Sequence, residues 1–128
     1  MKEIVLAESA GFCFGVNRSV SLAEQMLDQY TECYSLGQLI HNDDVVRHFQ
    51  ERGLHVVNTP EEVPEGAPVI IRAHGVSKDV KQRLQARTEH VVDSTCPKVL
   101  RIHKLAAEAG AEGRQVVVIG TRTHPEVI

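Results

Sequence analysis

The chain has 128 residues, of which 42% are hydrophobic and 4% aromatic, and its formal net charge is −3 at pH 7. This length suits one ordinary domain with an aliphatic core, and the slightly acidic balance gives no reason to expect a nucleic-acid partner. No apolar run approaches the ~20 residues of a membrane span, so we expect no membrane partner and a cytoplasmic location.

Short apolar segments that end in turn residues predict strands along the whole chain. They cover residues 4–7, 31–36, 54–57, 69–71, 90–93 and 114–119. Because the first of them begins so close to Met1, it leaves no room for a signal or transit peptide. One helical turn is expected in the connector between the third and fourth strands, at residues 61–62.

Helical patterns follow most of these segments, and residues that favour the N-cap position precede them. Asn42 and Ser77 are each expected to cap a helix. Ser94 and Thr95 are N-cap types that stand just before Pro97, which suits the first helical turn. Pro125 indicates a further helix close to the end of the sequence.

This alternation of strands and helices predicts an α/β fold. Strands that are mostly continuous runs of Val and Ile are typical of a parallel sheet with helices on both faces. The strand expected at residues 114–119 has no helix after it that would return to the sheet. We therefore expect a segment of something longer and not a finished domain.

Residues able to bind metals or anions come directly after several of the predicted strands. They are Cys13, His41, His74, Cys96 and His124. In an open α/β sheet the loops at the strands' carboxyl ends meet at one crevice, where helix amino ends also favour anions. Glu126 adds a carboxylate that could deliver a proton.

The three cysteines are expected to differ in role. An odd number in a chain of this kind argues against a disulfide framework and leaves metal binding or catalysis open. Cys33 lies within a predicted strand and is interpreted as a small buried hydrophobe. Cys96 stands at the amino end of a predicted helix, which favours the thiolate that binds metals.

The other polar residues near these loops have simpler interpretations. A single histidine at a strand end is more often a loop residue, but three at equivalent ends favour a shared site. His103 is interpreted as a core or supporting residue of its helix, and His48, His55 and His90 as structural. The flanking basic residues are interpreted as solvated surface, and they are Arg18, Arg72, Lys98, Arg101 and Arg122.

Five motifs in the same order resemble those of the 4-hydroxy-3-methylbut-2-enyl diphosphate reductase family, the iron–sulfur enzymes that end the methylerythritol phosphate route to isoprenoids. They are Gly11–Arg18, Ile40–Asn42, Arg72–Ser77, Asp93–Pro97 and His124–Val127. Any one of them alone would be a weak signal, whereas the ordered set is very specific.

The resemblance implies an oxidoreductase acting on a CH or CH2 group, with a [4Fe-4S] cluster held by three cysteines. Cys13 and Cys96 match two of these ligands. The histidines at 41, 74 and 124 match positions that bind the substrate's diphosphate or hydroxyl, and Glu126 matches the residue implicated in proton delivery. The implied reaction is a two-electron reductive dehydroxylation that gives isopentenyl and dimethylallyl diphosphates, with ferredoxin or flavodoxin as the electron donor.

The chain departs from the family in length and in one ligand. Family members are more than twice as long and build three similar α/β units around a central cavity. Residues 1–96 would form the first unit and residues 97–128 the truncated start of a second, and Cys33 does not match the third cysteine ligand. We therefore expect the 128-residue chain alone to be inactive or to bind a cluster only very weakly.

Two other functions stay open on the residues alone. One is a truncated α/β module without catalysis that at most binds anions. The other is a hydrolase or phosphatase that uses Cys13 or Cys96 as a nucleophile, although neither loop has the glycine-rich cradle such a thiolate needs.

Overall fold

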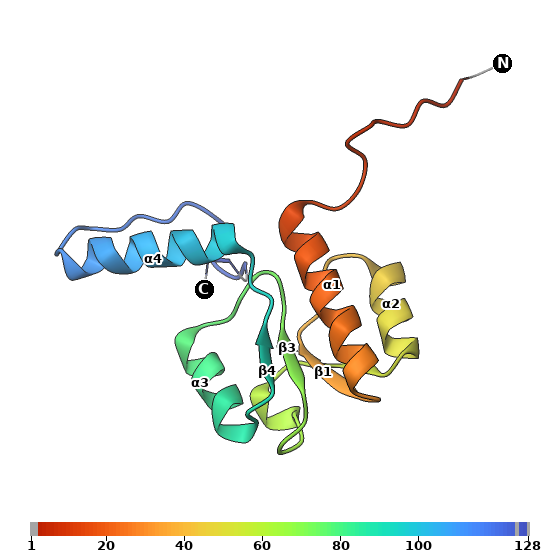
Figure 1. Cartoon of the computed structure of the whole chain (residues 1–128). Coiled ribbons are helices and arrows are strands. Elements are labelled where there is room, and N and C mark those ends of the chain that lie inside the picture. Colours follow the sequence, from red (N-terminus) through yellow and green to blue (C-terminus); the bar gives the residue numbers. More distant parts are fainter. Residues whose placement is uncertain (1–2, 125, 128) are drawn as a thin grey trace.

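The computed structural model describes residues 3–124 and 126–127, and within them the chain forms one parallel sheet flanked by helices (Figure 1). The strands are β1 (Cys33–Leu36), β2 (Leu54–Val57), β3 (Val69–Ile71) and β4 (Val91–Asp93). The helices are α1 (Phe14–Gln29), α2 (Asp43–Glu51), the 3-10 helix η1 (Pro60–Glu62), α3 (Lys78–Arg87) and α4 (Pro97–Ala111).

The sheet has the strand order β2-β1-β3-β4, and every neighbouring pair is parallel. In its register Ser35 lies opposite both Val56 and Ile70, and Ile70 lies opposite Val92. Helices α1 and α2 lie on one side of the sheet and α3 lies on the other (Figure 1). The prediction of an α/β fold with a parallel sheet and helices on both faces is thus confirmed.

The core consists of two aliphatic clusters, one on each face of the sheet. On the first face Ala23 and Phe49 pack with Ile70, and on the second face Leu84 and Val63 pack with Ile71. Neighbouring residues of β3 therefore point to opposite faces, as the pleat of a strand requires. Because both faces are covered, the carboxyl edge of the sheet is left for ligand sites.

Two of the predicted helix caps are confirmed and one is wrong. The side chains of Asn42 and Ser77 accept hydrogen bonds from Val45 N and Val80 N, at the starts of α2 and α3. At the start of α4, however, the N-cap is Cys96. Ser94 and Thr95 come too early, because each bonds elsewhere: the Ser94 hydroxyl donates to the carbonyl of Ile71, and the Thr95 hydroxyl donates to the carboxylate of Asp93.

Two predicted strands are wrong. Within residues 3–124, neither the segment at 4–7 nor the one at 114–119 forms a strand. Ile4 is 90% exposed and Ile119 is 96% exposed, so these apolar residues pack against little. An apolar run becomes a strand only where a neighbouring strand accepts its backbone hydrogen bonds, and these two segments lie beside no strand of the described sheet. The helix indicated by Pro125 starts at a residue outside those that the structure describes.

Helix α4 extends away from the sheet (Figure 1). Val99 in its first turn is buried, but Ile102 and Leu105, which follow it at helical spacing, are 64% and 54% exposed. Only the amino end of α4 therefore belongs to the packed body and helps to build a site. In the part of the chain that the structure describes, we find no helix long and apolar enough to cross a membrane.

Candidate functional site

Cys13 and Cys96 occupy equivalent places at the amino ends of two helices. Cys13 is the N-cap of α1 and Cys96 is the N-cap of α4. Among the described contacts neither side chain makes a capping hydrogen bond, so neither thiol is occupied by its own helix. Both have extended or near-extended backbone, with ψ angles of 163° and 129°, because each lies where the chain turns into a helix.

Gly15 brings the two helix starts together. A Cβ built on this residue would lie 2.6 Å from the Sγ of Cys96, closer than real Cβ contacts allow. The thiol of Cys96 therefore packs against the bare backbone of the first turn of α1, at a residue two positions after Cys13. In the sequence, the only sign of this contact is a glycine two positions after Cys13. The sequence does not show that Cys96 is the residue that packs against this glycine.

The two cysteines line one cavity of about 260 Å³ together with three of the predicted site residues. Those residues are His41 from the loop after β1, His74 from the loop after β3, and Glu126. The rings of His41 and His74 lie 4.7 Å apart between centroids. His41, His74 and Cys96 thus meet at the carboxyl edge of the sheet, because the parallel strands β1, β3 and β4 all end there.

His124 lies at the margin of this group. Its ring centroid is 6.3 Å from that of His74, and the two rings meet edge to face. Its Nδ1 accepts a hydrogen bond from the backbone N–H of Glu126, which leaves Nε2 as the donor. All six predicted site residues are therefore neighbours, five on the cavity wall and His124 beside His74.

The electrostatics of the cavity centre on His74. Burial lowers the pKa of His74, and the positive fields of His41, Arg72 and His124 lower it further, while Glu126 acts in the opposite direction. The balance of these groups shifts His74 toward the neutral imidazole. A bound anion in this cavity would raise the pKa of His74 again and favour its protonated form.

Hydrogen bonds hold the loop before Cys96 in place. The N–H of Cys96 donates to the carbonyl of Ala73 at 2.9 Å, which ties this loop to the one that bears His74. Below it, the hydroxyls of Ser19 and Ser94 lie 2.6 Å apart and are fully buried, so they join α1 to the end of β4. The sequence signal for this contact was a serine on the buried face of an amphipathic helix, and the contact was not among our predictions.

Asp93 fixes the same loop from the other side. Its carboxylate accepts from the Lys81 Nζ at 2.7 Å and from the backbone N–H of Thr95 at 3.0 Å. Burial raises the pKa of Asp93, but the hydrogen bonds from Lys81 and Thr95 outweigh it and hold the pKa below its ordinary value. Arg18, interpreted from sequence as solvated surface, in fact donates to the carbonyls of Thr95 and Asp93 at 3.4 Å.

The third cysteine and the remaining histidines lie outside the cavity. Cys33 is fully buried in β1 within the core under α1 and α2, and burial raises the pKa of its thiol. Its prediction as a small buried hydrophobe is confirmed. His103, interpreted as a core or supporting residue, is exposed instead, because α4 leaves the sheet after its first turn. The three predicted structural histidines are exposed as well, and they are His48, His55 and His90.

The described side chains do not make up a complete metal site. Among residues 3–124 and 126–127 no group of three or more His, Cys, Asp or Glu side chains is close enough to hold a metal ion. The thiols of Cys13 and Cys96 do share one cavity, and both cysteines are free. Cys13 and Cys96 could therefore supply two thiolate ligands of a metal site, but the described residues do not supply a complete ligand set.

Fold and cavity together define a class: an open parallel α/β protein whose candidate ligand site, with two cysteines and two histidines on its wall, lies at the carboxyl edge of the sheet. The family model of the LytB protein matches residues 4–128. The chain belongs to the LytB family, which confirms the resemblance drawn from the five motifs.

Curated proteins similar to this chain are named as the same enzyme. A 4-hydroxy-3-methylbut-2-enyl diphosphate reductase from Aquifex aeolicus is 41% identical over 129 residues, covering 100% of this chain and 44% of its own length. One from Caldanaerobacter subterraneus is 38% identical over 130 residues and is covered to 45%. The chain thus spans less than half the length of these relatives.

Solved structures of the same enzyme share the fold. A structure of (E)-4-hydroxy-3-methyl-but-2-enyl diphosphate reductase superposes with a TM-score of 0.84 and 41% identity, over 99% of this chain and 45% of that one. The corresponding reductase from Plasmodium falciparum gives a TM-score of 0.89 with 28% identity, over 94% of this chain and 38% of that one. The described fold is therefore that of part of such a reductase.

Proposed function

We propose that this chain takes part in the reductive dehydroxylation of 4-hydroxy-3-methylbut-2-enyl diphosphate to isopentenyl and dimethylallyl diphosphates. In this reaction the substrate takes up two electrons and two protons, and its hydroxyl leaves as water. The observation that supports the proposal most is the shared cavity, in which the thiols of Cys13 and Cys96 lie with His41, His74 and Glu126. The substrate is the one in the names of the relatives.

The cofactor in this proposal is a [4Fe-4S] cluster, of which Cys13 and Cys96 would each bind one iron. When bound, the cluster supplies the electrons and an iron with an open position that polarises the substrate hydroxyl. Cys33 is excluded as a ligand because it is fully buried in the core and does not line the cavity. Two thiolates are one fewer than the implied set, so we expect the chain by itself to be inactive or to bind a cluster very weakly.

The three histidines of the site would bind the substrate's diphosphate or hydroxyl as N–H donors. A diphosphate in the cavity would add negative charge beside His74, whose pKa is lowered by burial and by the positive fields of its neighbours. Binding of the anion and protonation of His74 would therefore favour each other. Glu126, on the cavity wall, would hold the proton that is delivered to the leaving hydroxyl or to the allyl carbon.

Two further parts of the proposal concern partners and organisation. Ferredoxin or flavodoxin would supply the electrons, and a cytoplasmic location agrees with three free cysteines. Residues 1–96 would form one α/β unit and residues 97–128 the start of another. The arrangement supports this division, since all the described strands lie between residues 33 and 93 while α4 extends away from them.

Anaerobic reconstitution with iron and sulfide, in an enzyme preparation that contains the complete set of cysteine ligands, tests the cofactor assignment. We expect brown, oxygen-sensitive visible absorption that is reduced in Cys13→Ser and in Cys96→Ser. Cys33→Ser is the matched control, because its thiol lies in the core, and it should keep the absorption of the unchanged protein. Equal loss of absorption in all three variants, or a colourless protein throughout, would contradict the assignment.

The role of Glu126 needs an enzyme preparation that contains the complete set of cysteine ligands. In single-turnover kinetics Glu126→Gln should slow product formation while the visible absorption of the cluster stays unchanged. Unchanged rates would remove the proton-delivery role.

A cluster-free anion-binding module is the second candidate function. It is favoured by the neighbouring imidazoles, since the rings of His41 and His74 are 4.7 Å apart between centroids and no metal-binding group of three is found among the described residues. A colourless protein that binds diphosphate, and loses this binding in His41→Ala, would support this second function over the first.

A further inference from the structure

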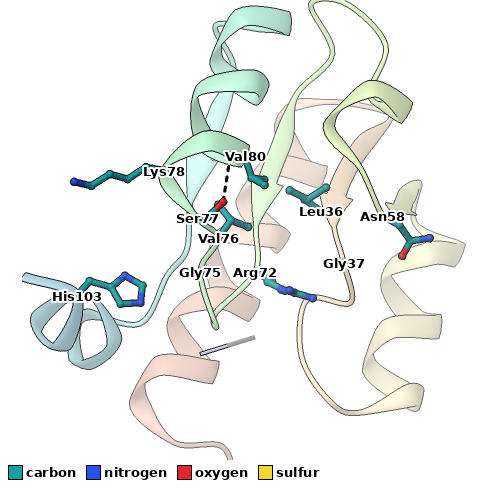
Figure 2. A pocket seen from close by; sticks show the side chains of 10 residues that line it. All are labelled: Leu36, Gly37, Asn58, Arg72, Gly75, Val76, Ser77, Lys78, Val80 and His103. Carbon is teal, nitrogen blue, oxygen red and sulfur yellow. Dashed lines mark hydrogen bonds between the residues drawn. The ribbon is translucent and has the colours of Figure 1, made fainter. Parts of the chain in front are cut away.

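A second cavity, of about 400 Å³, opens at the carboxyl edge of the sheet beside the start of α3 (Figure 2). Its walls come from the end of β1 at Leu36 and Gly37, the loop after β3 at Arg72 and Gly75, and the first residues of α3. No residue that lines it also lines the two-cysteine cavity, among the described residues. The two cavities are therefore separate sites at the same edge.

The charge of this cavity is opposite to that of the whole chain. Arg72, Lys78 and His103 line it, and none of its described lining residues is acidic. The chain has a formal net charge of −3, so this concentration of basic groups is local. Figure 2 shows them arising from three different elements: the loop after β3, the start of α3, and α4. Such an arrangement attracts anions.

Arg72 is the most informative of these residues. Its Nε is buried and has no hydrogen-bond partner among the described atoms, and its guanidinium takes part in none of the ion pairs found in the described chain. A buried polar group without a partner is costly, and a charged one more so. A guanidinium that lines a cavity and makes no ion pair is complementary to an oxyanion, which can accept two parallel N–H bonds from its terminal nitrogens.

Gly37 makes room for this guanidinium. The residue has a φ of +75°, and a Cβ built on it would lie 2.5 Å from Nη1 of Arg72. The planar group therefore lies against bare backbone at the end of β1, inside the cavity wall (Figure 2).

The amino end of α3 adds to the same wall. Ser77 accepts a hydrogen bond from Val80 N at 3.4 Å, which leaves the earlier N–H groups of the helix without a partner of their own within the helix. These groups and the helix dipole favour a negative charge. The remaining wall includes Leu36, Val76 and Val80, which are apolar.

We propose that this cavity binds a phosphate group carried by a small organic molecule. The phosphate would lie against Arg72, Lys78 and the amino end of α3, with His103 as a further donor. The organic part would pack on Leu36, Val76 and Val80. A cavity of about 400 Å³ has the size typical of small-molecule sites and exceeds what a free phosphate ion needs. This proposal does not depend on the function proposed above.

Backbone amide NMR with two probes, inorganic phosphate and phenyl phosphate, tests it. We expect both probes to shift the amide signals of Gly37, Gly75 and Ser77. Phenyl phosphate should bind several-fold more tightly, because its ring buries apolar surface that inorganic phosphate lacks. Shifts confined to residues around Cys13 and His41 would overturn this proposal, and would leave the function proposed for that cavity standing. Equal affinity for the two probes would overturn the organic part of the ligand.

Substitutions test the assigned residues. Arg72→Gln should weaken phenyl phosphate binding about tenfold or more, since a charge-assisted hydrogen-bonding group is lost. Lys78→Glu is a second test in case Arg72→Gln disturbs the fold. This variant should fold normally, because Lys78 is exposed and an acidic residue is favourable in the first turn of a helix. It should weaken binding at least about threefold.

Lys98→Glu is the matched control, since Lys98 is also an exposed lysine in the first turn of a helix, α4, but lines neither cavity among the described residues. Binding should be unchanged in this variant. Equal weakening by Lys78→Glu and Lys98→Glu would show a general effect of charge and would overturn the proposal.

Discussion

At the scale of single residues, the candidate site depends on one close approach. The thiol of Cys96 fits beside α1 only because residue 15 has no side chain, since a Cβ there would lie 2.6 Å from Sγ and 3.1 Å from the Cβ of Cys96. The position of one proposed cluster ligand is therefore determined by a residue that would not itself bind the cluster.

Gly15→Ala tests this dependence. Alanine favours a helix by about 0.5–1 kcal/mol over glycine, so the helix itself should not suffer, but the new methyl group should push the Cys96 side chain away. We expect Cys96 to react faster with a thiol reagent, followed by mass spectrometry of the labelled peptide. Gly110→Ala is the matched control, because Gly110 lies in α4 with nothing within 4 Å of its added Cβ. Equal rates for Cys96 in the two variants would contradict the contact.

His74 makes the stability of the fold depend on pH. Its pKa is lowered from an ordinary value of 6.5, first by burial and then by the positive groups around it. The unfolded chain therefore binds this proton more readily, so the stabilising contribution is complete above about pH 6.5 and is lost as the pH falls. In urea unfolding, His74→Gln should lose less stability between pH 7.5 and pH 5.5 than the unchanged protein does. Parallel pH profiles for the two proteins would show that other groups cause the effect.

At the scale of elements, buried hydroxyls connect α1 to β4 and its following loop. Ser94 donates to the carbonyl of Ile71, and its oxygen lies 2.6 Å from that of Ser19. Both serines are fully buried, so water cannot reach their hydroxyls, and these hydrogen bonds satisfy the polar atoms instead. The link holds the loop that ends in Cys96 against the helix that starts after Cys13.

Ser94→Ala should destabilise the protein by about 1–3 kcal/mol, because the hydroxyl of Ser19 and the carbonyl of Ile71 would stay buried without this partner. Chemical denaturation measures the change. Ser21→Ala, on the exposed face of the same helix, should change stability by less than about 0.5 kcal/mol. The double variant Ser19→Ala with Ser94→Ala should cost less than the sum of the two single changes, and strict additivity would argue against a coupled pair.

At the scale of the whole molecule, the packed body and the rest of the chain differ sharply. The residues of β3 are fully buried, with both neighbours in the sheet paired to them. The segment at 116–119 has side chains between 44% and 96% exposed and forms no strand in the described chain. Both cavities lie at the carboxyl edge of the packed body, and each has a lining residue from beyond it, His103 of α4 in one and Glu126 in the other.

Hydrogen exchange should show this division. The amides of Val69–Ile71 should exchange most slowly, while those of residues 4–6 and 116–119 should exchange almost freely, because they lack ladder hydrogen bonds. Mass spectrometry of peptic peptides gives the rates. Protection at 116–119 equal to that at 69–71 would mean that this segment pairs in solution, as the sequence pattern led us to expect.

Local patterns were sufficient for most of the fold. Four of the predicted strands form at β1 to β4, Asn42 and Ser77 cap their helices, and η1 forms where one turn was expected. These features depend on side-chain periodicity and on contacts a few residues apart, which a sequence displays directly. The meeting of His41, His74 and Cys96 followed from one further rule, that parallel strands all end at the same edge. Cys13 and Glu126 line the same cavity although the strands predicted before them do not form in the described chain.

Only the tertiary structure decided the rest, because it depends on partners far away in the chain. Residues 4–7 and 114–119 have the composition of strands, but no neighbouring strand in the described sheet accepts their hydrogen bonds. Arg72 was interpreted as solvated surface, and its buried, unpartnered Nε is evident only once β1 and α3 lie beside it. Composition and spacing determine which elements can form, whereas the space left between packed elements determines which side chains remain available to a ligand.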